Sequence, residues 1–302
     1  MELYLFGAGA SAFSGDVSPK PPPLGDHAYS ELRKACRDWR KNISPATAAV
    51  FRSRGFEAGL AAIEEACPEM LSPLLREMGR YFLEFEPGAR NLYRDVVANL
   101  DPRAACLATL NYDMLLEEAV ADRFGGTGIW GGQPLGVLKL HGSGAIVPVG
   151  NDSFRNMAFV NPGGAISEGP CNQFSRKVAL EYWSRSRGAL APAMAMYAEG
   201  KRVLHSPSFI LELQSIYQAH CRHAERIFLI GLRCVPADSH IWKPLIDSPA
   251  RLVFANPTLE DGQEFLSWAR SAGISERVEL WELGFREALR RRWPLAYLGA
   301  RN

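Results

Sequence analysis

Three polar side chains that could take part in a reaction follow two short apolar segments of the chain. The amide Asn111 and the carboxyl Asp113 come after Ala105–Leu110, and the imidazole His141 comes directly after Gly136–Leu140. Amides hold polar ligands, carboxylates stabilise positive charge, and an imidazole can act as a general base near neutral pH. The set has chemical content only if the fold brings its members together.

A glycine-rich turn at the start of the chain adds an anion-binding element. The apolar run Leu3–Phe6 leads into the residues Gly7, Ala8, Gly9, Ala10 and Ser11. Glycines permit a sharp turn and leave room for a ligand next to the backbone. The N–H groups at the start of a following helix favour an anion, usually a phosphate. Taken alone, a structural turn explains this segment about equally well.

Each of these residues also has a structural interpretation. Asn111 or Asp113 could cap the helix predicted over Met114–Phe124, because Asn and Asp are favoured at helix starts. His141 could be a buried histidine with satisfied hydrogen bonds, and Ser11 could cap the first helix. The functional interpretation is favoured because all of these residues occur together in the order expected for one crevice.

The elements that must position these residues alternate between strands and helices. Six short apolar segments predict strands, most of them buried on both faces. They are Leu3–Gly7, Ala105–Leu110, Gly136–Leu140, Arg226–Gly231, Arg251–Ala255 and Val278–Trp281. With helices between them, these strands predict an α/β fold with a doubly wound, mostly parallel six-stranded sheet of the Rossmann type. Ligands bind beyond the carboxyl ends of such strands, where the polar residues above would meet.

The segments between the strands show helical periodicity and suggest how the chain is organised. Helices are predicted over Asp26–Trp39, Phe56–Ala66, Pro73–Phe85, Leu92–Leu100, Met114–Phe124, Leu190–Glu199, Ser208–His223, Leu259–Ala272 and Phe285–Trp293. We predict a single domain over residues 1–302, with a helical cap at about 16–100 and a lid or insertion at about 150–202.

Composition bounds the class of partner. A net charge of +1 gives no global case for direct nucleic-acid binding, although four arginines near the end form either a solvated helix face or a partner-binding patch: Arg286, Arg290, Arg291 and Arg292. The six cysteines form no Cys-x-x-Cys pair, so we expect no metal site and a reducing cytoplasm. No apolar stretch approaches the roughly 20 residues that cross a bilayer, so no membrane contact is expected.

The polar segments resemble those of the SIR2 (sirtuin) superfamily, specifically the SIR2-like NAD hydrolases of bacterial anti-phage systems. The resemblance rests on Gly7–Ser11, Thr109–Asp113 and Lys139–Ser143. Weaker matches are Ile227–Gly231, which leads to Asp238–His240, and Phe254–Asn256. The matching pieces span residues 1–256, and the resemblance does not include the cap and the insertion between them.

Two departures from the superfamily pattern favour plain NAD cleavage. Sirtuin deacetylases usually carry two Cys-x-x-Cys pairs for a structural zinc, which this chain lacks. Many also have Gly-Thr-Ser near the fourth strand, where this chain has Gly231, Leu232 and Arg233. The alternatives that stay open are an NAD-dependent protein deacylase or ADP-ribosyltransferase, and a non-catalytic module that binds NAD or ADP-ribose.

The resemblance implies that NAD is the substrate. The diphosphate would lie over the glycine turn, with the nicotinamide ribose near Asn111, Asp113 and His141. In these roles Asn111 would hold the ribose or the attacking water, Asp113 would stabilise an oxocarbenium-like charge, and His141 would act as general base. The products would be nicotinamide and ADP-ribose. Gly231 and Asn256 would contribute to cofactor binding, Asn256 near the adenosine ribose.

The resemblance also implies regulation, since an unrestrained NAD hydrolase would poison its own cell. We expect a homo-oligomer, a separately encoded regulatory or sensor protein, or both. Asp238 and His240 follow the fourth predicted strand and would line the same crevice, although a helix start is the favoured role for Asp238.

Overall fold

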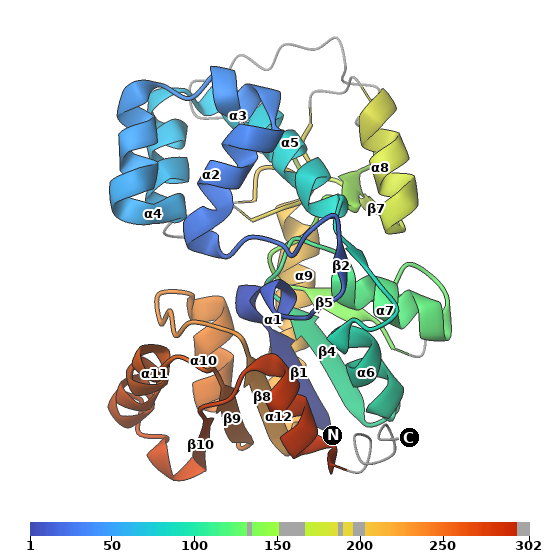
Figure 1. Cartoon of the computed structure of the whole chain (residues 1–302), viewed down its shortest axis with the longest axis vertical. Helices are drawn as coiled ribbons and strands as arrows, with labels where there is room; N and C mark the ends of the chain where they lie inside the picture. Colours follow the sequence, from blue (N-terminus) through green and yellow to red (C-terminus); the bar gives the residue numbers. More distant parts are fainter. Residues whose placement is uncertain (132–134, 151–166, 187–189, 196–202, 295–302) are drawn as a thin grey trace.

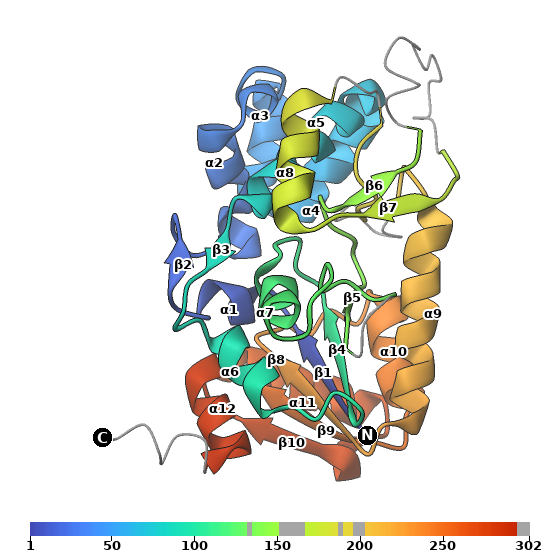
Figure 2. The ribbon, with the colours of Figure 1, turned by 90° about the vertical axis from the view of Figure 1, so that its right-hand side faces the viewer.

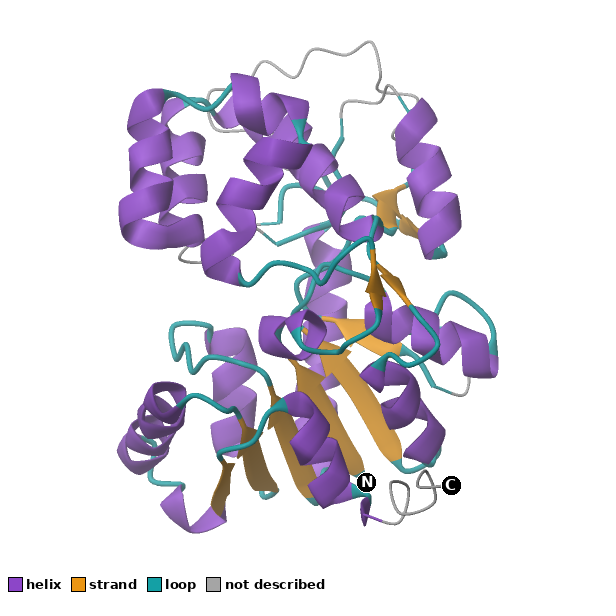
Figure 3. Cartoon of the chain, in the orientation of Figure 1, coloured by secondary structure: helices purple, strands orange, loops and turns teal. Residues whose placement is uncertain are grey.

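The computed structural model describes residues 1–131, 135–150, 167–186, 190–195 and 203–294. A parallel sheet flanked by helices forms one part of the molecule, and a helical cap lies beyond the carboxyl ends of its strands (Figure 1). Figure 3 shows the same division by secondary structure, with the long strands gathered in the lower part and helices dominating the upper part.

The central sheet has six strands, all parallel, in the order β10-β9-β8-β1-β4-β5. They are β1 (Glu2–Phe6), β4 (Ala105–Thr109), β5 (Val137–Lys139), β8 (Arg226–Ile230), β9 (Arg251–Ala255) and β10 (Val278–Trp281). Numbered in chain order within this sheet and read from β5, the order is 3-2-1-4-5-6, which is the Rossmann order. The predicted fold class is confirmed, and the switch point lies between β1 and β8.

All six strands of this sheet end in one row. Phe6 pairs with Thr109 on one side and with Ile230 on the other. Their neighbours continue the row, from Thr109 to Lys139 and from Ile230 through Ala255 to Trp281. Because the strands are parallel, the segments that follow these six residues leave the sheet at one edge. Every segment that carries a predicted site residue therefore starts from the same edge.

Alternation along β1 divides the core between the two faces of the sheet. Tyr4 and Phe6 belong to one buried cluster, and Leu3 and Leu5 belong to another. The first cluster includes α6 (Leu92–Asn99), α7 (Leu115–Phe124) and α12 (Phe285–Arg292). The second includes α9 (Pro207–His223), α10 (Ser239–Asp247) and α11 (Leu259–Ser271). Burial on both faces explains why the strands are continuous apolar runs.

The cap consists of α2 (Gly25–Ala35), α3 (Arg37–Lys41), α4 (Pro45–Ala66) and α5 (Leu71–Leu83), with the short turn η1 (Pro68–Met70) before α5. Four aromatic rings fill its centre. Tyr29 stacks on Phe51 with ring centroids 4.1 Å apart, and Trp39 stacks on Phe56 at 5.7 Å. α4 comprises two helical segments that meet at Gly55, whose φ of +89° suits glycine.

The cap differs from the prediction in three places. The helix predicted over Asp26–Trp39 is divided into α2 and α3, because Cys36 is extended with φ −109° and ψ 135°. The first half of α4 is absent from the prediction. α6, which the sequence grouped with the cap, lies beside the sheet (Figure 1).

The remaining elements connect the two parts. β2 (Val17–Ser18) pairs with β3 (Glu86–Pro87), and β6 (Ile146–Pro148) pairs with β7 (Cys171–Gln173), which precedes α8 (Arg176–Arg185). α9 runs alongside both parts (Figure 2). Among the described residues, no helix has the length and apolar character to cross a membrane.

The predicted lid at about 150–202 lies partly outside the described residues, at 151–166, 187–189 and 196–202. Within it, the helix expected over Leu190–Glu199 is wrong for Leu190–Ala195, the part that is described. Pro192 disrupts a helix interior. Met194 and Ala195 instead form bridges to Gly142 and Val203.

Candidate active site

The glycine turn packs directly against the loop after β8, at the switch point of the sheet. The N–H groups of Gly7 and Gly9 donate to the carbonyl oxygens of Ile230 and Gly231, at 3.0 and 2.9 Å. A Cβ on Gly7 would lie 2.6 Å from the Gly231 oxygen. Gly231 itself has φ +65°, and its Cβ would lie 2.2 Å from the nitrogen of Ala10. Contact between two backbone segments therefore requires these glycines.

The same contacts occupy donors that a phosphate would need. Besides Gly7 and Gly9, the N–H of Ala10 donates to the Gly7 oxygen at 3.0 Å. The helix that follows, α1 (Ala8–Ala12), has only five residues. The N–H groups of the turn therefore serve packing at the switch point.

The Ser11 hydroxyl is the centre of a buried hydrogen-bond network. It accepts from Nδ2 of Asn111 at 2.8 Å and donates to Oδ1 of Asp113 at 3.2 Å. A hydroxyl has one hydrogen, so the phenol of Tyr93, 3.0 Å away, is the donor in the third contact. Burial raises the pKa of Tyr93 and keeps that phenol protonated. The Ser11 hydroxyl thus uses its one hydrogen and accepts two hydrogen bonds. It thereby links the loops after β1 and β4 to α6.

The amide of Asn111 has a fixed orientation. Nδ2 donates to the Gly7 carbonyl at 2.9 Å as well as to Ser11, and a backbone carbonyl can only accept. The side-chain oxygen Oδ1 accepts no hydrogen bond from any described residue, although Asn111 is only 9% exposed. Asn111 does not cap α7. An acceptor atom therefore remains at the carboxyl end of β4, next to the switch point.

Asp113 has both a structural and an electrostatic role. Its Oδ1 accepts from the N–H of Leu115 at 3.1 Å, so it serves the start of α7, as the structural interpretation predicts. Burial raises the pKa of Asp113, while the positive charge of Lys139 opposes that shift. Nζ of Lys139 also donates to the Asp113 carbonyl oxygen at 2.5 Å.

Lys139 and Glu117 are residues of the site region that sequence reasoning missed. Nζ of Lys139 lies 3.1 Å from Oε1 of Glu117, and both side chains are within 1% of full burial. Burial raises the pKa of Glu117 to about 7, against the opposing charge of Lys139. A lysine inside the apolar run Gly136–Leu140 was the available signal, since lysine is almost never fully buried without a partner.

His141 reaches a second imidazole. Its Nε2 lies 3.1 Å from Nε2 of His240, and His141 is 2% exposed. His240 lies in the first turn of α10, after β8, whereas His141 follows β5. The segments that carry Asn111, His141 and His240 therefore gather beyond the same edge of the sheet.

Asn256 holds two loops together. Its Nδ2 donates to the Leu232 carbonyl at 2.8 Å and to Asp261 at 3.0 Å, and its Oδ1 accepts from the N–H of Thr258 at 2.9 Å. This pattern is that of an Asx turn at the start of α11. The structural interpretation of Asn256, a turn before Pro257, thus explains the hydrogen bonds of its side-chain amide.

The arginine-rich end of the chain packs in part on the sheet. Arg291 pairs with Glu279 at 2.8 Å and lies 4.5 Å above the ring of Trp281. Arg292 pairs with Glu2 at 2.5 Å. Arg291 and Arg292 thus hold part of this segment against the sheet.

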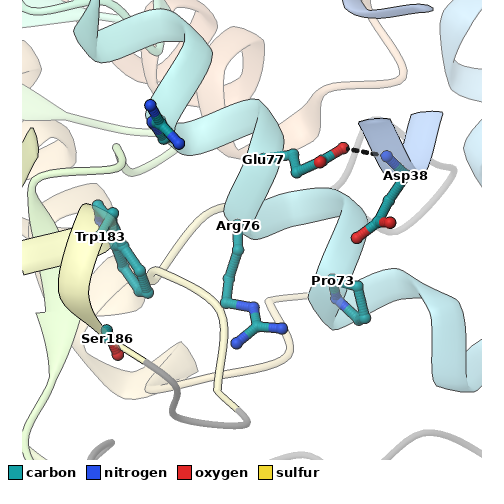
Figure 4. Close-up of a pocket in the computed structure, with 7 residues that line it drawn as sticks. Asp38, Pro73, Arg76, Glu77, Trp183 and Ser186 are labelled. Carbon is teal, nitrogen blue, oxygen red and sulfur yellow. Dashed lines mark hydrogen bonds between the residues drawn. The ribbon is translucent and has the colours of Figure 1, made fainter. Parts of the chain in front are cut away.

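Two cavities lie elsewhere in the molecule and are not lined by the predicted site residues. One, of about 270 Å³, lies in the cap between α3, α5 and α8 (Figure 4) and is lined by Asp38, Pro73, Arg76, Glu77, Arg80, Trp183 and Ser186. The carboxylate of Glu77 accepts three backbone N–H groups at the start of α3, so it organises the cap. The other, of about 370 Å³, lies between β7 and the loop after α7.

Comparisons with known proteins add no assignment. No family model matches the chain, and no curated protein sequence matches it significantly. In the part of the chain that the structure describes, no group of three or more His, Cys, Asp or Glu could hold a metal ion.

Proposed function

We propose that this chain is an NAD⁺ glycohydrolase, which cleaves NAD⁺ to nicotinamide and ADP-ribose. The observation that carries the proposal is the Asn111 amide. Both hydrogens of Nδ2 are anchored, to Gly7 and Ser11, and the acceptor Oδ1 remains without a described partner beside the switch point. Dinucleotides bind Rossmann folds across that point, beyond the carboxyl ends of the strands.

The reaction needs three functions at this edge. As the bond from nicotinamide to ribose breaks, its electron pair leaves with nicotinamide and the sugar becomes oxocarbenium-like. The Asp113 carboxylate, held by Ser11, Leu115 and the charge of Lys139, would stabilise that cation. Oδ1 of Asn111 would accept a hydrogen bond from a ribose hydroxyl or from the attacking water. His141 would take the proton of that water as the new C–O bond forms.

Restraint is part of the proposal, because continuous loss of NAD⁺ would kill the cell that makes the enzyme. We place the chain as the NAD⁺-depleting effector of an anti-phage system, held inactive by assembly or by a separately encoded partner. The support is the resemblance of the polar segments to such effectors.

A second candidate is a module that binds NAD⁺ or ADP-ribose without turnover. One observation favours it: Ser11 and Asp113 hydrogen-bond to each other, so both serve the packing of the loops after β1 and β4. This candidate predicts a bound dinucleotide that stays intact.

Chromatography of NAD⁺ incubated with the purified chain, with calorimetric titration to detect bound NAD⁺, separates these candidates. The samples are the chain alone, the chain with proteins from its neighbouring genes, and each of these with an acylated peptide. Nicotinamide and ADP-ribose without peptide support the hydrolase, and products only with peptide indicate a deacylase or an ADP-ribosyltransferase. Binding without products in every sample indicates the binding module, and neither binding nor products contradicts the proposal.

A further inference from the structure

Two imidazoles from opposite sides of the switch point meet beyond the sheet edge. The Nε2 atoms of His141 and His240 are 3.1 Å apart, and the ring centroids are 5.3 Å apart. Their segments follow β5 and β8, which are separated in the sheet by β4 and β1. Three strand spacings amount to about 14 Å. The two segments therefore converge from both sides of the strand ends that carry Asn111 and Gly7.

The short distance between two like atoms limits the protons that the pair can hold. An imidazole nitrogen either donates or accepts, so the contact requires one protonated Nε2 and one bare Nε2. A neutral ring with a bare Nε2 carries its proton on Nδ1. Two imidazolium rings would present N–H groups to each other with like charge, so the pair in contact holds at most one positive charge.

The place of His240 in the fold indicates which ring accepts. It is the second residue of α10, a helix of nine residues. The positive end of the helix dipole disfavours a positive charge in the first turn. A shared proton on Nε2 of His141, accepted by a bare Nε2 of His240, keeps any positive charge of the pair on the ring that lies outside the first turn of α10.

A metal ion could in principle join two imidazoles at this spacing. Structural and catalytic zinc sites, however, use three or four protein ligands. No such group of three His, Cys, Asp or Glu exists within the described ranges. A proton accounts for the contact without further ligands.

We propose that His240 is a positioning residue for His141: it accepts a hydrogen bond from Nε2–H and thereby fixes the orientation and tautomer of that ring. Its part in catalysis rests on the proposed function, whereas the contact does not. In the proposed reaction an O–H bond of water breaks, an N–H bond forms at the His141 ring, and the oxygen keeps the electron pair that bonds to the sugar carbon. The bond to His240 then becomes charge-assisted and stronger, which stabilises the imidazolium.

Nitrogen chemical shifts test the contact without any substrate. The chain has six histidines, so His141→Leu and His240→Leu assign the two signals by their loss. At neutral to mildly alkaline pH, long-range proton–nitrogen correlation should show the proton of His141 on Nε2 and that of His240 on Nδ1. His240→Leu should change the His141 nitrogens, while His223→Leu, an exposed control at the end of α9, should not.

A bare Nε2 on neutral His141, an Nε2–H on His240, or His141 nitrogen shifts that do not change in His240→Leu would overturn the proposal. Because NAD⁺ is absent, this result does not depend on the proposed reaction. If the tautomers agree but no NAD⁺ is ever cleaved, the proposed function fails and the contact stands.

Kinetics test the positioning role. His240→Leu should lower kcat about 10- to 100-fold, the range found when the partner that orients a metal-binding histidine is removed. KM for NAD⁺ should change little. His240→Gln, whose carbonyl can accept near the position of Nε2, should recover most of that loss. A full rate in His240→Leu, or a loss confined to KM, contradicts the role.

Discussion

Nδ2 of Asn111 donates a 2.8 Å hydrogen bond to the hydroxyl of Ser11, one hundred residues earlier in the chain. With the bond to Gly7, this contact joins the loops that follow two neighbouring strands. Nδ2 of the amide therefore stabilises the two loops, whereas Oδ1 accepts no hydrogen bond from the described residues. A substitution at Asn111 should affect both stability and activity, and the two effects can be measured separately.

Asn111→Ala should lower the free energy of unfolding by about 1–3 kcal/mol, because Gly7 and Ser11 lose a buried donor. Urea denaturation followed by circular dichroism measures the change. Asn42→Ala, in the exposed turn after α3, is the matched control and should stay within about 0.5 kcal/mol of the wild type. Equal stability of the two variants would show that the Nδ2 hydrogen bonds are not formed.

Gly231→Ala should destabilise the fold more than Gly273→Ala. Both glycines have positive φ, +65° and +70°, so both substitutions carry backbone strain. Only at Gly231 would the new Cβ collide, 2.2 Å from the nitrogen of Ala10, whereas nothing lies within 4 Å of the Cβ at Gly273. Overpacking should add about 1–3 kcal/mol to the loss at Gly231. Equal melting temperatures for the two variants would contradict the tight contact at the switch point.

Much of the sheet follows from the sequence because its strands are buried on both faces. Arg251–Ala255 and Val278–Trp281 have the predicted bounds, since polar residues end each apolar run. The division of Asp26–Trp39 could not be predicted from local pattern. Glu77, about 40 residues away, accepts the N–H groups that begin α3. For the first half of α4 a signal existed, because Ser44 caps the helix and Pro45 follows it.

For the candidate site, too, the sequence predicts one part and not the other. That Asn111, Asp113 and His141 follow strands could be deduced from the sequence, and parallel strands place such residues at one edge. Their partners could not be deduced. Tyr93 reaches Ser11 from α6, 82 residues away, and His240 reaches His141 across 99 residues. Such pairings depend on how the helices pack on the sheet, and the spacing of apolar residues along the sequence does not determine that packing.

The buried pair of Glu117 and Lys139 predicts a pH dependence of stability. The pKa of Glu117 is raised from 4.5 to about 7, so the folded state binds the proton more tightly than the unfolded state. This contribution to stability is fully present below about pH 4.5 and is lost as the pH rises through about 7. Glu117→Gln removes the titrating group and serves as the reference.

The unfolding free energy of the wild type minus that of Glu117→Gln should therefore fall between about pH 4.5 and 7 and stay level above that range. Denaturant titrations at several pH values measure it. A difference that is level between about pH 4.5 and 7 and falls as the pH drops below 4.5 would mean that Lys139 lowers the pKa of Glu117 instead.

The central claim is that Asn111 and His141 act together on the glycosidic bond of NAD⁺. The most direct test compares initial rates of nicotinamide release by the wild type, Asn111→Ala and His141→Ala, with Asn42→Ala and His223→Ala as matched controls. We predict wild-type rates for both controls and a loss of about 10²- to 10⁴-fold for His141→Ala, the range for removing a general base. Asn111→Ala should fall by a similar factor while staying folded. Nicotinamide release at wild-type rates by both site variants would contradict the account.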